Sequence, residues 1–206
     1  MSAAMLPTVH LVRHGETEWS LAHRHTSFTD VPLTHRGEQQ ALRLADRLRG
    51  PEFTRVFSSP RIRSRRTCEL AGLTSKIELN PDVAEWDYGE YEGVTTVDIW
   101  KQRPNWNLFR HGCPQGESPE HVARRADRVV AMLRHTQGPS AVFSHGHFLR
   151  VLAARWVGWP VVEGRCLLLG VASISVLSWA HNNPAEPSIA QWNTTAGDAP
   201  ENPPFP

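Results

Sequence analysis

The apolar run at residues 9–12 ends abruptly in Arg13, His14 and Gly15. A short apolar run bounded by polar residues is typical of a buried strand, and residues 8–12 form the first strand that we predict. Arginine is a permanent cation that suits phosphate, histidine can be a nucleophile or proton carrier near neutral pH, and glycine lets the backbone turn closely. Taken alone, these residues are more typical of a strand that ends in solvated polar side chains than of a strand that ends at a reactive site. Whether they have a function therefore depends on the partners that the rest of the chain supplies.

Strand-like and helix-like patterns alternate along the chain. Apolar or alternating runs predict further strands at residues 55–58, 76–79, 141–144 and 171–179. Helical periodicity with capping residues predicts helices at residues 34–48, 61–70, 119–136 and 148–156. This alternation predicts an α/β fold, a single three-layer α/β/α domain with a mostly parallel central sheet. We assign residues 1–193 to that domain and residues 194–206, which are dominated by Pro, Asn and Gly, to a disordered tail.

Composition narrows the classes of protein further. The 206 residues are 40% hydrophobic, which suits one domain with a sizeable core. Lys+Arg is 22 and Asp+Glu is 21, so we expect neither a stripe of basic residues for nucleic acid nor an acidic tail. The sequence shows neither a secretory signal nor an apolar run that could span a membrane. Three cysteines without a CxxC spacing, Cys68, Cys113 and Cys166, favour a reduced, cytoplasmic setting.

Reactive residues follow each of the three predicted core strands. In α/β sheets, ligands bind beyond the carboxyl ends of the strands, so these residues should lie close together. Arg13 and His14 follow the first strand, and His145 and Gly146 follow the third. The second strand is followed by Ser58, Ser59, Arg61, Arg63, Arg65 and Arg66. Helix amino termini and arginines both favour anions, so the sequence predicts a phosphate pocket, although the residues alone do not select one arginine of the cluster.

Phosphoryl transfer would use such a pocket. It needs a nucleophile in line with the leaving oxygen, cations for the other oxygens, and an acid for the leaving group. His14 can attack phosphorus, and a protonated His145 could add a third cation. Residues 80–93 form a predicted loop that offers Glu85, Asp87 and Glu90 as acids. Glu85 fits best because Trp86 gives it an apolar setting, but a solvated loop acid is the default for all three.

Four segments, taken in order, resemble one known family. Residues 11–17 (LVRHGET), 58–67 (SSPRIRSRRT), 85–93 (EWDYGEYEG) and 144–146 (SHG) are similar to motifs of the histidine phosphatase superfamily, also called phosphoglycerate-mutase-like. Within that superfamily, residues 29–34, 111–114, 116–118 and 144–147 look like the branch of bacterial broad-specificity acid phosphatases and fungal sedoheptulose-bisphosphatases. The resemblance implies a phosphatase that acts on a small phosphorylated metabolite through a phosphohistidine, without metal or cofactor.

The resemblance also assigns roles to single residues. It implies that His14 is the nucleophile, that Glu85 is the proton donor, and that His145 completes the catalytic set. Arg13 and Arg63 would hold the phosphoryl group, so the resemblance selects Arg63 from the arginine cluster. Gly146, Thr26 and Ser20 would also approach the phosphate. The family usually has Asn where Ser20 stands, and serine has a shorter reach.

Three other functions were weighed against a metal-independent phosphomonoesterase. A cofactor-dependent phosphoglycerate mutase would share the nucleophile, but residues 94–119 are short and offer only Lys101, Arg103 and Arg110 as cations. A phosphate-recognition module without turnover would lack the acid. A metal phosphoesterase could use His145 and His147, but no Asp-rich loop accompanies them.

Two further expectations concern the outside of the molecule. Arg124 and Arg125 are expected on the surface of the helix at residues 119–136. The oligomeric state is left open between a monomer and a homodimer.

Overall fold

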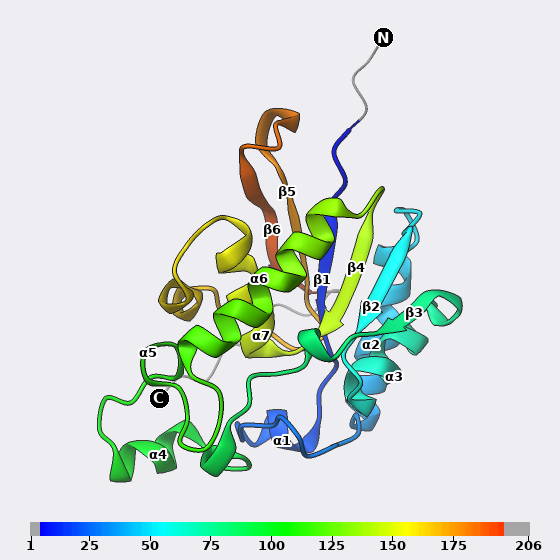
Figure 1. The fold of residues 1–206 in the computed structure, drawn as a ribbon. Coiled ribbons are helices and arrows are strands. Elements are labelled where there is room, and N and C mark those ends of the chain that lie inside the picture. The colour runs from blue at the N-terminus through cyan, green and yellow to red at the C-terminus, as the bar shows by residue number, and fades with distance from the viewer. Residues whose placement is uncertain (1–4, 196–206) are drawn as a thin grey trace.

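A six-stranded sheet forms the centre of the protein, as a computed structural model that describes residues 5–195 shows (Figure 1). Its strands are β1 (Val9–Arg13), β2 (Arg55–Ser58), β3 (Ile77–Leu79), β4 (Ser140–Ser144), β5 (Ile174–Trp179) and β6 (Pro187–Thr194). They lie in the order β3-β2-β4-β1-β5-β6. The first four are mutually parallel, whereas β5 runs antiparallel to both β1 and β6. The predicted α/β class and mostly parallel sheet are therefore confirmed.

Two pairs of helices cover the two faces of the sheet. The helices α2 (His35–Leu48) and α3 (Ile62–Leu70) lie on one face, and α6 (Pro119–His135) and α7 (Gly146–Trp156) lie on the other (Figure 1). Each face buries its own apolar cluster, because alternate side chains of a strand point to opposite sides. Val12 and Phe143 pack toward α2 and α3, and Leu11 and Val142 pack toward α6 and α7. This is the three-layer arrangement that the alternating pattern predicts.

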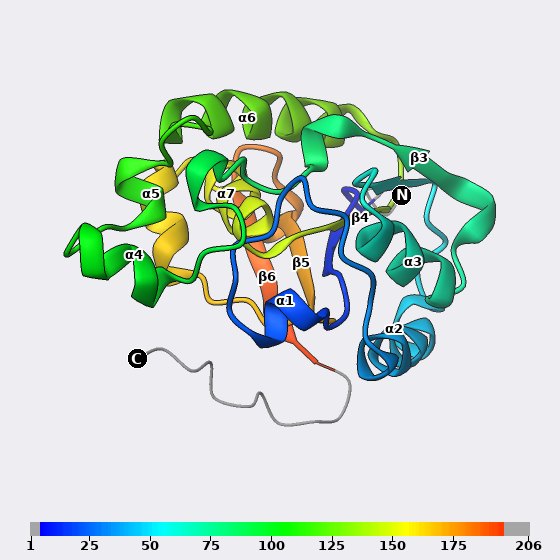
Figure 2. The same ribbon diagram turned by 90° about the horizontal axis from the view of Figure 1, so that it is seen from below.

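The remaining helices are short. They are α1 (Glu18–Leu21), α4 (Thr96–Gln102), α5 (Leu108–His111) and short 3₁₀ segments at Thr74–Lys76, Pro81–Val83, Gly89–Tyr91, Val161–Cys166 and Ala180–Asn182. Seen from below, α1 lies under the carboxyl ends of the parallel strands, between α2 and α3 on one side and α4 and α5 on the other (Figure 2). The chain therefore folds its loops and short helices over the end of the sheet where we expected the site.

Three boundaries differ from the sequence predictions. Residues 108–111, in a segment for which we predict no helix, form the single turn α5. Residues 171–173, predicted as strand, form a turn instead, because Ala172 adopts a left-handed φ of 49° and its N–H donates to the carbonyl of His14. Thr194, which we placed in the tail, is the last residue of β6, and residues 196–206 lie outside the described residues.

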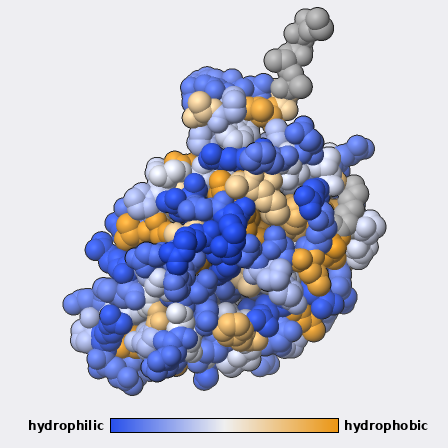
Figure 3. Space-filling view, viewed as in Figure 1, coloured by the Kyte–Doolittle hydropathy of each residue, from blue (hydrophilic) through white to orange (hydrophobic). Residues whose placement is uncertain are grey.

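The surface seen from the front is mostly hydrophilic, with hydrophobic side chains in small separate patches (Figure 3). Within residues 5–195, no helix is both long and apolar enough to cross a membrane.

Candidate active site

His14 lies at the carboxyl end of β1 and is almost wholly buried. Its Nδ1 is 2.7 Å from the carbonyl oxygen of Gly15, and a carbonyl can only accept, so Nδ1 carries the proton and Nε2 is the basic nitrogen. Burial and the nearby Arg63 and Arg13 guanidinium groups hold the pKa of His14 well below its usual range. His14 is therefore a neutral imidazole whose unprotonated nitrogen is Nε2.

His145 stands beside His14 at the end of the neighbouring strand β4. The two rings meet edge to face, with centroids 5.2 Å apart. Arg63 Nε donates to His145 Nδ1 over 3.2 Å, and His145 Nε2 lies 2.8 Å from Ser59 Oγ. Because Nδ1 accepts from a guanidinium, the His145 proton is on Nε2 and the ring is neutral. Burial and Arg63 also hold the pKa of His145 well below its usual range. The expectation that a protonated His145 supplies a third cation is therefore wrong for this structure.

Arg63, in the first turn of α3, is completely buried. Besides His145, it binds the loop before α2: Nη1 donates to the carbonyl of Thr29, and Nη2 to the carbonyls of Thr26 and Ser27, over 3.0 to 3.2 Å. Four of its five N–H groups are thus used, one from Nε, one from Nη1 and two from Nη2. Arg63 ties this loop to the histidine pair.

Glu85 lies opposite, in the loop after the turn at Pro81–Val83, and is buried. Its carboxylate accepts three backbone hydrogen bonds: from Trp86 N at 2.9 Å, from His147 N at 3.1 Å and from Phe148 N at 2.7 Å. The N-cap residue of α7, His145, makes no side-chain cap, so Glu85 from a distant segment takes that place. Its charge is close enough to act on the pKa of Arg13 and Arg63.

The two competing acids point elsewhere. The Asp87 carboxylate accepts from Gly89 N at 2.9 Å within its own loop, and Glu90 is exposed. Of the three acids that the sequence offered, Glu85 alone binds the first turn of α7, the helix that follows His145. The geometry therefore favours Glu85, the acid that the apolar setting of Trp86 also favoured.

Arg13 and Gly146 pack directly against each other. A Cβ at position 146 would lie 3.2 Å from Cζ of Arg13 and 3.3 Å from its Nε, so a side chain there would crowd the guanidinium that crosses the first turn of α7. Arg13 donates through Nη1 to the carbonyl of Leu169, while its buried Nε has no hydrogen-bond partner. Burial lowers the pKa of Arg13.

Two predicted phosphate-binding hydroxyls bond to local backbone instead. Ser20 Oγ donates to Thr17 O and accepts from Thr17 N, both at 2.9 Å, and so completes a capping box at the start of α1. Thr26 Oγ1 donates to the carbonyl of Arg24 at 3.0 Å, while the Thr26 carbonyl serves Arg63. The structure brings together seven of the eight predicted residues by their side chains or backbone: Arg13, His14, Thr26, Arg63, Glu85, His145 and Gly146.

A polar and aromatic cluster beside Glu85 was not among the predicted site residues. Tyr88 Oη lies 2.6 Å from His147 Nδ1, and the His25 ring packs 4.7 Å from Tyr88 and 6.0 Å from His147. Burial raises the pKa of Tyr88 well above its usual range, so the phenol is the donor. The sequence signal was weak, because these residues come from segments more than 50 positions apart.

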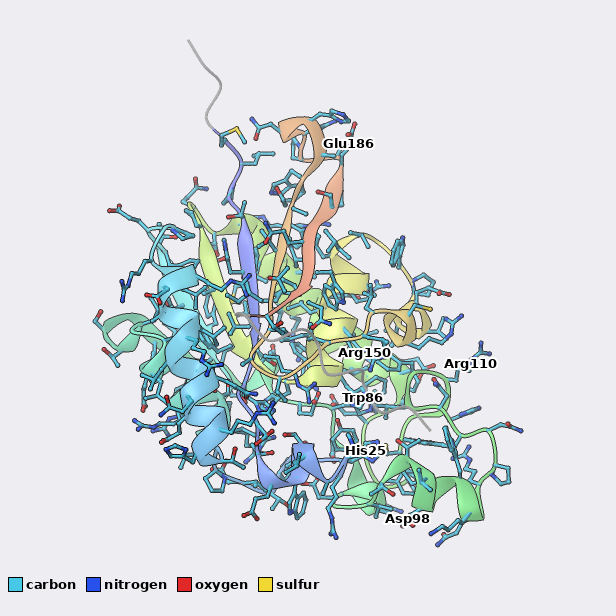
Figure 4. All side chains as sticks on the ribbon, turned by 180° about the vertical axis from the view of Figure 1, so that it is seen from behind. His25, Trp86, Asp98, Arg110, Arg150 and Glu186 are labelled. Carbon is cyan, nitrogen blue, oxygen red and sulfur yellow. The ribbon has the colours of Figure 1, made fainter. Side chains whose placement is uncertain are left out.

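Arg150 joins this cluster from the next turn of α7. It lies over the ring of Phe109 at 4.5 Å, and burial together with Arg13 lowers its pKa to about 10. Arg150, Trp86 and His25 gather at one end of the sheet, and Glu186 marks the opposite end (Figure 4). The cluster therefore lies beside Glu85 at the start of α7.

Arg125, which we expected on the surface, has only 11% of its side chain exposed, so that expectation is wrong. Its guanidinium pairs with Glu117 and donates to backbone carbonyls around Glu85. Arginine is rarely buried without a partner, and here the partners come from other loops. Among residues 5–195, no group of three or more His, Cys, Asp or Glu side chains is arranged to hold a metal ion.

Comparison with known proteins identifies the family. The model of the histidine phosphatase superfamily (branch 1) matches residues 9–195. A Mycobacterium tuberculosis protein named acid phosphatase is 46% identical over 176 residues, which cover 83% of this chain and 86% of that protein. A Saccharomyces cerevisiae protein named sedoheptulose 1,7-bisphosphatase is 32% identical over an alignment that covers 90% of this chain and 92% of that protein.

A solved structure agrees with these sequence matches. The structure of the product of an open reading frame of Mycobacterium tuberculosis superposes with a TM-score of 0.87 at 39% identity, and the match covers 92% of this chain and 98% of that one. The family model and the matches to these relatives all cover the domain that carries the candidate site. The chain therefore belongs to the histidine phosphatase superfamily.

Proposed function

We propose that this enzyme, a histidine phosphatase by family, is a metal-independent phosphomonoesterase that hydrolyses small phosphorylated metabolites through a phosphohistidine. The observation that carries the proposal is the state of His14. Its Nδ1–H is bound to Gly15 O, and Nε2 is left unprotonated beside the buried guanidinium groups of Arg13 and Arg63. A neutral imidazole fixed in this way is a competent nucleophile toward an anion that two arginines attract.

The reaction then proceeds in two steps. His14 Nε2 attacks phosphorus while Glu85, which carries a proton in the enzyme–substrate complex, passes it to the leaving ester oxygen, so the P–O bond breaks and a P–N bond forms. Water next attacks the phosphohistidine, Glu85 takes a proton from it, and the P–N bond breaks to release phosphate. Arg13 and the remaining N–H of Arg63 neutralise the phosphoryl oxygens in both steps, and the Nε2–H of neutral His145 exchanges Ser59 Oγ for one of these oxygens.

The test is the loss of the nucleophile. His14→Ala should lower kcat/KM on p-nitrophenyl phosphate more than about a thousandfold, because the covalent route disappears. His121→Ala, at an exposed histidine of α6, is the matched control and should keep full activity. Acid-quenched wild-type enzyme should carry a phosphoryl group on the peptide with His14. Full activity of His14→Ala, or loss of wild-type activity on adding EDTA, would overturn the proposal.

The relatives named acid phosphatase and sedoheptulose 1,7-bisphosphatase support hydrolysis rather than phosphoryl return. A panel of sugar phosphates, sugar bisphosphates, phosphoglycerates and nucleotides, scored by phosphate release, should identify the substrate class. Conversion of 3-phosphoglycerate to 2-phosphoglycerate without release of phosphate would instead support the mutase alternative. We also propose a cytoplasmic location, in keeping with the free cysteines Cys68, Cys113 and Cys166. The choice between monomer and homodimer calls for a measurement of mass in solution.

A further inference from the structure

Arg125 binds the backbone carbonyls that lead up to Glu85 and the carbonyl of Glu85 itself. Its Nη1 donates to the carbonyls of Asp82 at 2.9 Å and Ala84 at 2.7 Å, and its Nη2 donates to the carbonyl of Glu85 itself at 3.2 Å. Only 11% of the Arg125 side chain is exposed. One guanidinium on α6 thus holds three carbonyls within four consecutive residues, in the short segment that carries the proposed proton donor.

Glu117 completes the clamp from the loop before α6. It accepts two hydrogen bonds from Arg125, from Nε at 2.9 Å and Nη2 at 2.6 Å, and its Oε2 also accepts from Asp87 N at 3.0 Å. Its backbone carbonyl accepts from Trp86 Nε1 and its N–H donates to Asp87 O. The loop is therefore bound before Glu85 by Arg125 and after it by Glu117. The bidentate pairing fixes the guanidinium in one orientation.

Arg125 also touches the element that receives the Glu85 carboxylate. Its Cζ lies 4.5 Å above the ring of Phe148, and Phe148 N donates to Glu85 Oε1 at 2.7 Å. The guanidinium therefore lies between the backbone of Glu85 and the first turn of α7. The same guanidinium therefore contacts the carbonyl of Glu85 directly, and it also packs on Phe148, whose N–H binds the Glu85 carboxylate.

We propose that Arg125, braced by Glu117, is a positioning residue that sets the place of the Glu85 carboxyl for proton transfer. A general acid must come within about 3 Å of the leaving oxygen, and a misplacement of about 1 Å can cost on the order of a hundredfold in rate. The inference rests on the proposed role of Glu85 as the proton donor. Arg125 itself touches no reacting atom.

The test compares two esters that differ in their need for an acid. p-Nitrophenyl phosphate has a stable leaving group and needs little proton transfer, whereas 2-glycerol phosphate has an alkoxide leaving group and needs it fully. Arg125→Met should lower kcat/KM on 2-glycerol phosphate by about thirty- to a hundredfold and on p-nitrophenyl phosphate by less than about fivefold. Adding Arg125→Met to Glu85→Gln should not lower the activity on 2-glycerol phosphate relative to p-nitrophenyl phosphate any further, since the acid that Arg125 positions is already absent.

Arg128→Met is the matched control. Arg128 lies one turn further along α6 and pairs with the Asp82 carboxylate, but it is exposed and touches no carbonyl of the loop. The Arg128→Met variant should leave the ratio of kcat/KM on 2-glycerol phosphate to kcat/KM on p-nitrophenyl phosphate unchanged. Arg125→Lys keeps the charge and should show the same selectivity, to a smaller degree, in a protein whose thermal unfolding stays close to that of wild type.

The outcomes separate this inference from the proposed function. If Glu85→Gln slows the alkyl ester selectively while Arg125→Met and Arg125→Lys slow both esters equally, Arg125 is a structural ion pair only and the inference fails alone. The same holds if the losses from Glu85→Gln and Arg125→Met multiply. If Glu85→Gln itself slows both esters equally, the acid role of Glu85 and the positioning role of Arg125 fall together.

Discussion

Thr67 supports the backbone turn at Gly15, directly after His14, through one hydroxyl group. Its Oγ1 accepts from Gly15 N at 3.0 Å and donates to the carbonyl of Arg63 at 2.7 Å, and the side chain is fully buried. Gly15 in turn supplies the carbonyl that holds His14 Nδ1. The hydroxyl therefore links the residue that orients the proposed nucleophile to the backbone of the buried arginine.

Thr67→Val should remove this link without changing the volume of the side chain. The Gly15 N–H is then buried without an acceptor, which costs about 1–3 kcal/mol. Urea unfolding should show this loss, and kcat/KM should fall about tenfold or more because the His14 ring loses its fixed support. Thr67→Ser, which keeps the hydroxyl, is the control and should retain most of the stability and most of the kcat/KM. Equal behaviour of the two variants would show that the hydroxyl does not matter.

The burial of a single side chain was hard to predict from the sequence, because its partners come from elsewhere in the chain. Arg63 stood among four similar arginines, and only the family resemblance selected it, because the carbonyls of the Thr26–Thr29 loop that bury it lie over 30 positions away. Arg125 was placed on the surface for the same reason: its burial depends on carbonyls about 40 positions away. Ser20 was predicted from a family position, but its hydroxyl caps α1.

The amino end of α2 packs directly on Gly15 and Glu16, the two residues that follow His14. Thr34, the N-cap of α2, donates from its backbone to Glu16 O at 3.0 Å and from its hydroxyl to the Glu16 carboxylate at 2.8 Å. Gly15 and Gly37 approach so closely that a Cβ on Gly15 would overlap the carbonyl of Gly37, and one on Gly37 would overlap the backbone of Glu16. The helix can reach the turn only because both positions are glycine.

Gly37→Ala should therefore push α2 away from the turn that carries His14. We expect a loss of about 1–3 kcal/mol in the free energy of unfolding, as in other overpacked sites, together with a fall in kcat. Gly50→Ala, just beyond the other end of the same helix, has no atom within 4 Å of the new Cβ and serves as the control. Chemical unfolding and steady-state kinetics of both variants make the comparison. A Gly37→Ala protein as stable and active as Gly50→Ala would refute the close contact.

Elements with a strong period were predictable, and single turns were not. The apolar stripe of α2 and the capping serine and proline of α6 predicted those helices, and the short apolar runs predicted β2 and β4. The turn α5 has only four residues, too few for a helical period. The start of β5 was overpredicted because β-branched and apolar residues continue into a segment that Ala172 turns aside.

At the scale of the whole molecule, the strand order creates the site. β4 lies between β1 and β2, so His14, His145 and Ser59 meet although they are far apart in the sequence. The rule that ligands bind beyond the carboxyl ends of parallel strands was enough to predict that these residues share an edge. It could not predict the loops that cover the edge, since their contacts depend on side chains from both halves of the chain.

This buried edge makes the stability of the whole molecule depend on pH. Burial holds the pKa of His14, His145 and His147 well below their usual range, while the unfolded chain titrates near about 6.5. As the pH falls below about 6.5, the unfolded state takes up protons that the folded state does not, so stability is present at neutral pH and lost on acidification. Each histidine can contribute up to about 1.4 kcal/mol per pH unit.

Urea unfolding at pH 7.5, 6.5 and 5.5 should therefore show a midpoint that falls steeply below pH 6.5. Paired carboxylates such as Asp82, whose pKa Arg128 lowers, add to this loss only at more acid pH, because their unfolded values lie near about 4. His145→Asn keeps a polar side chain but cannot titrate, so it should flatten the dependence by about one histidine's share. Stability that is constant or rises between pH 7.5 and 5.5 would contradict a site built from neutral, buried histidines.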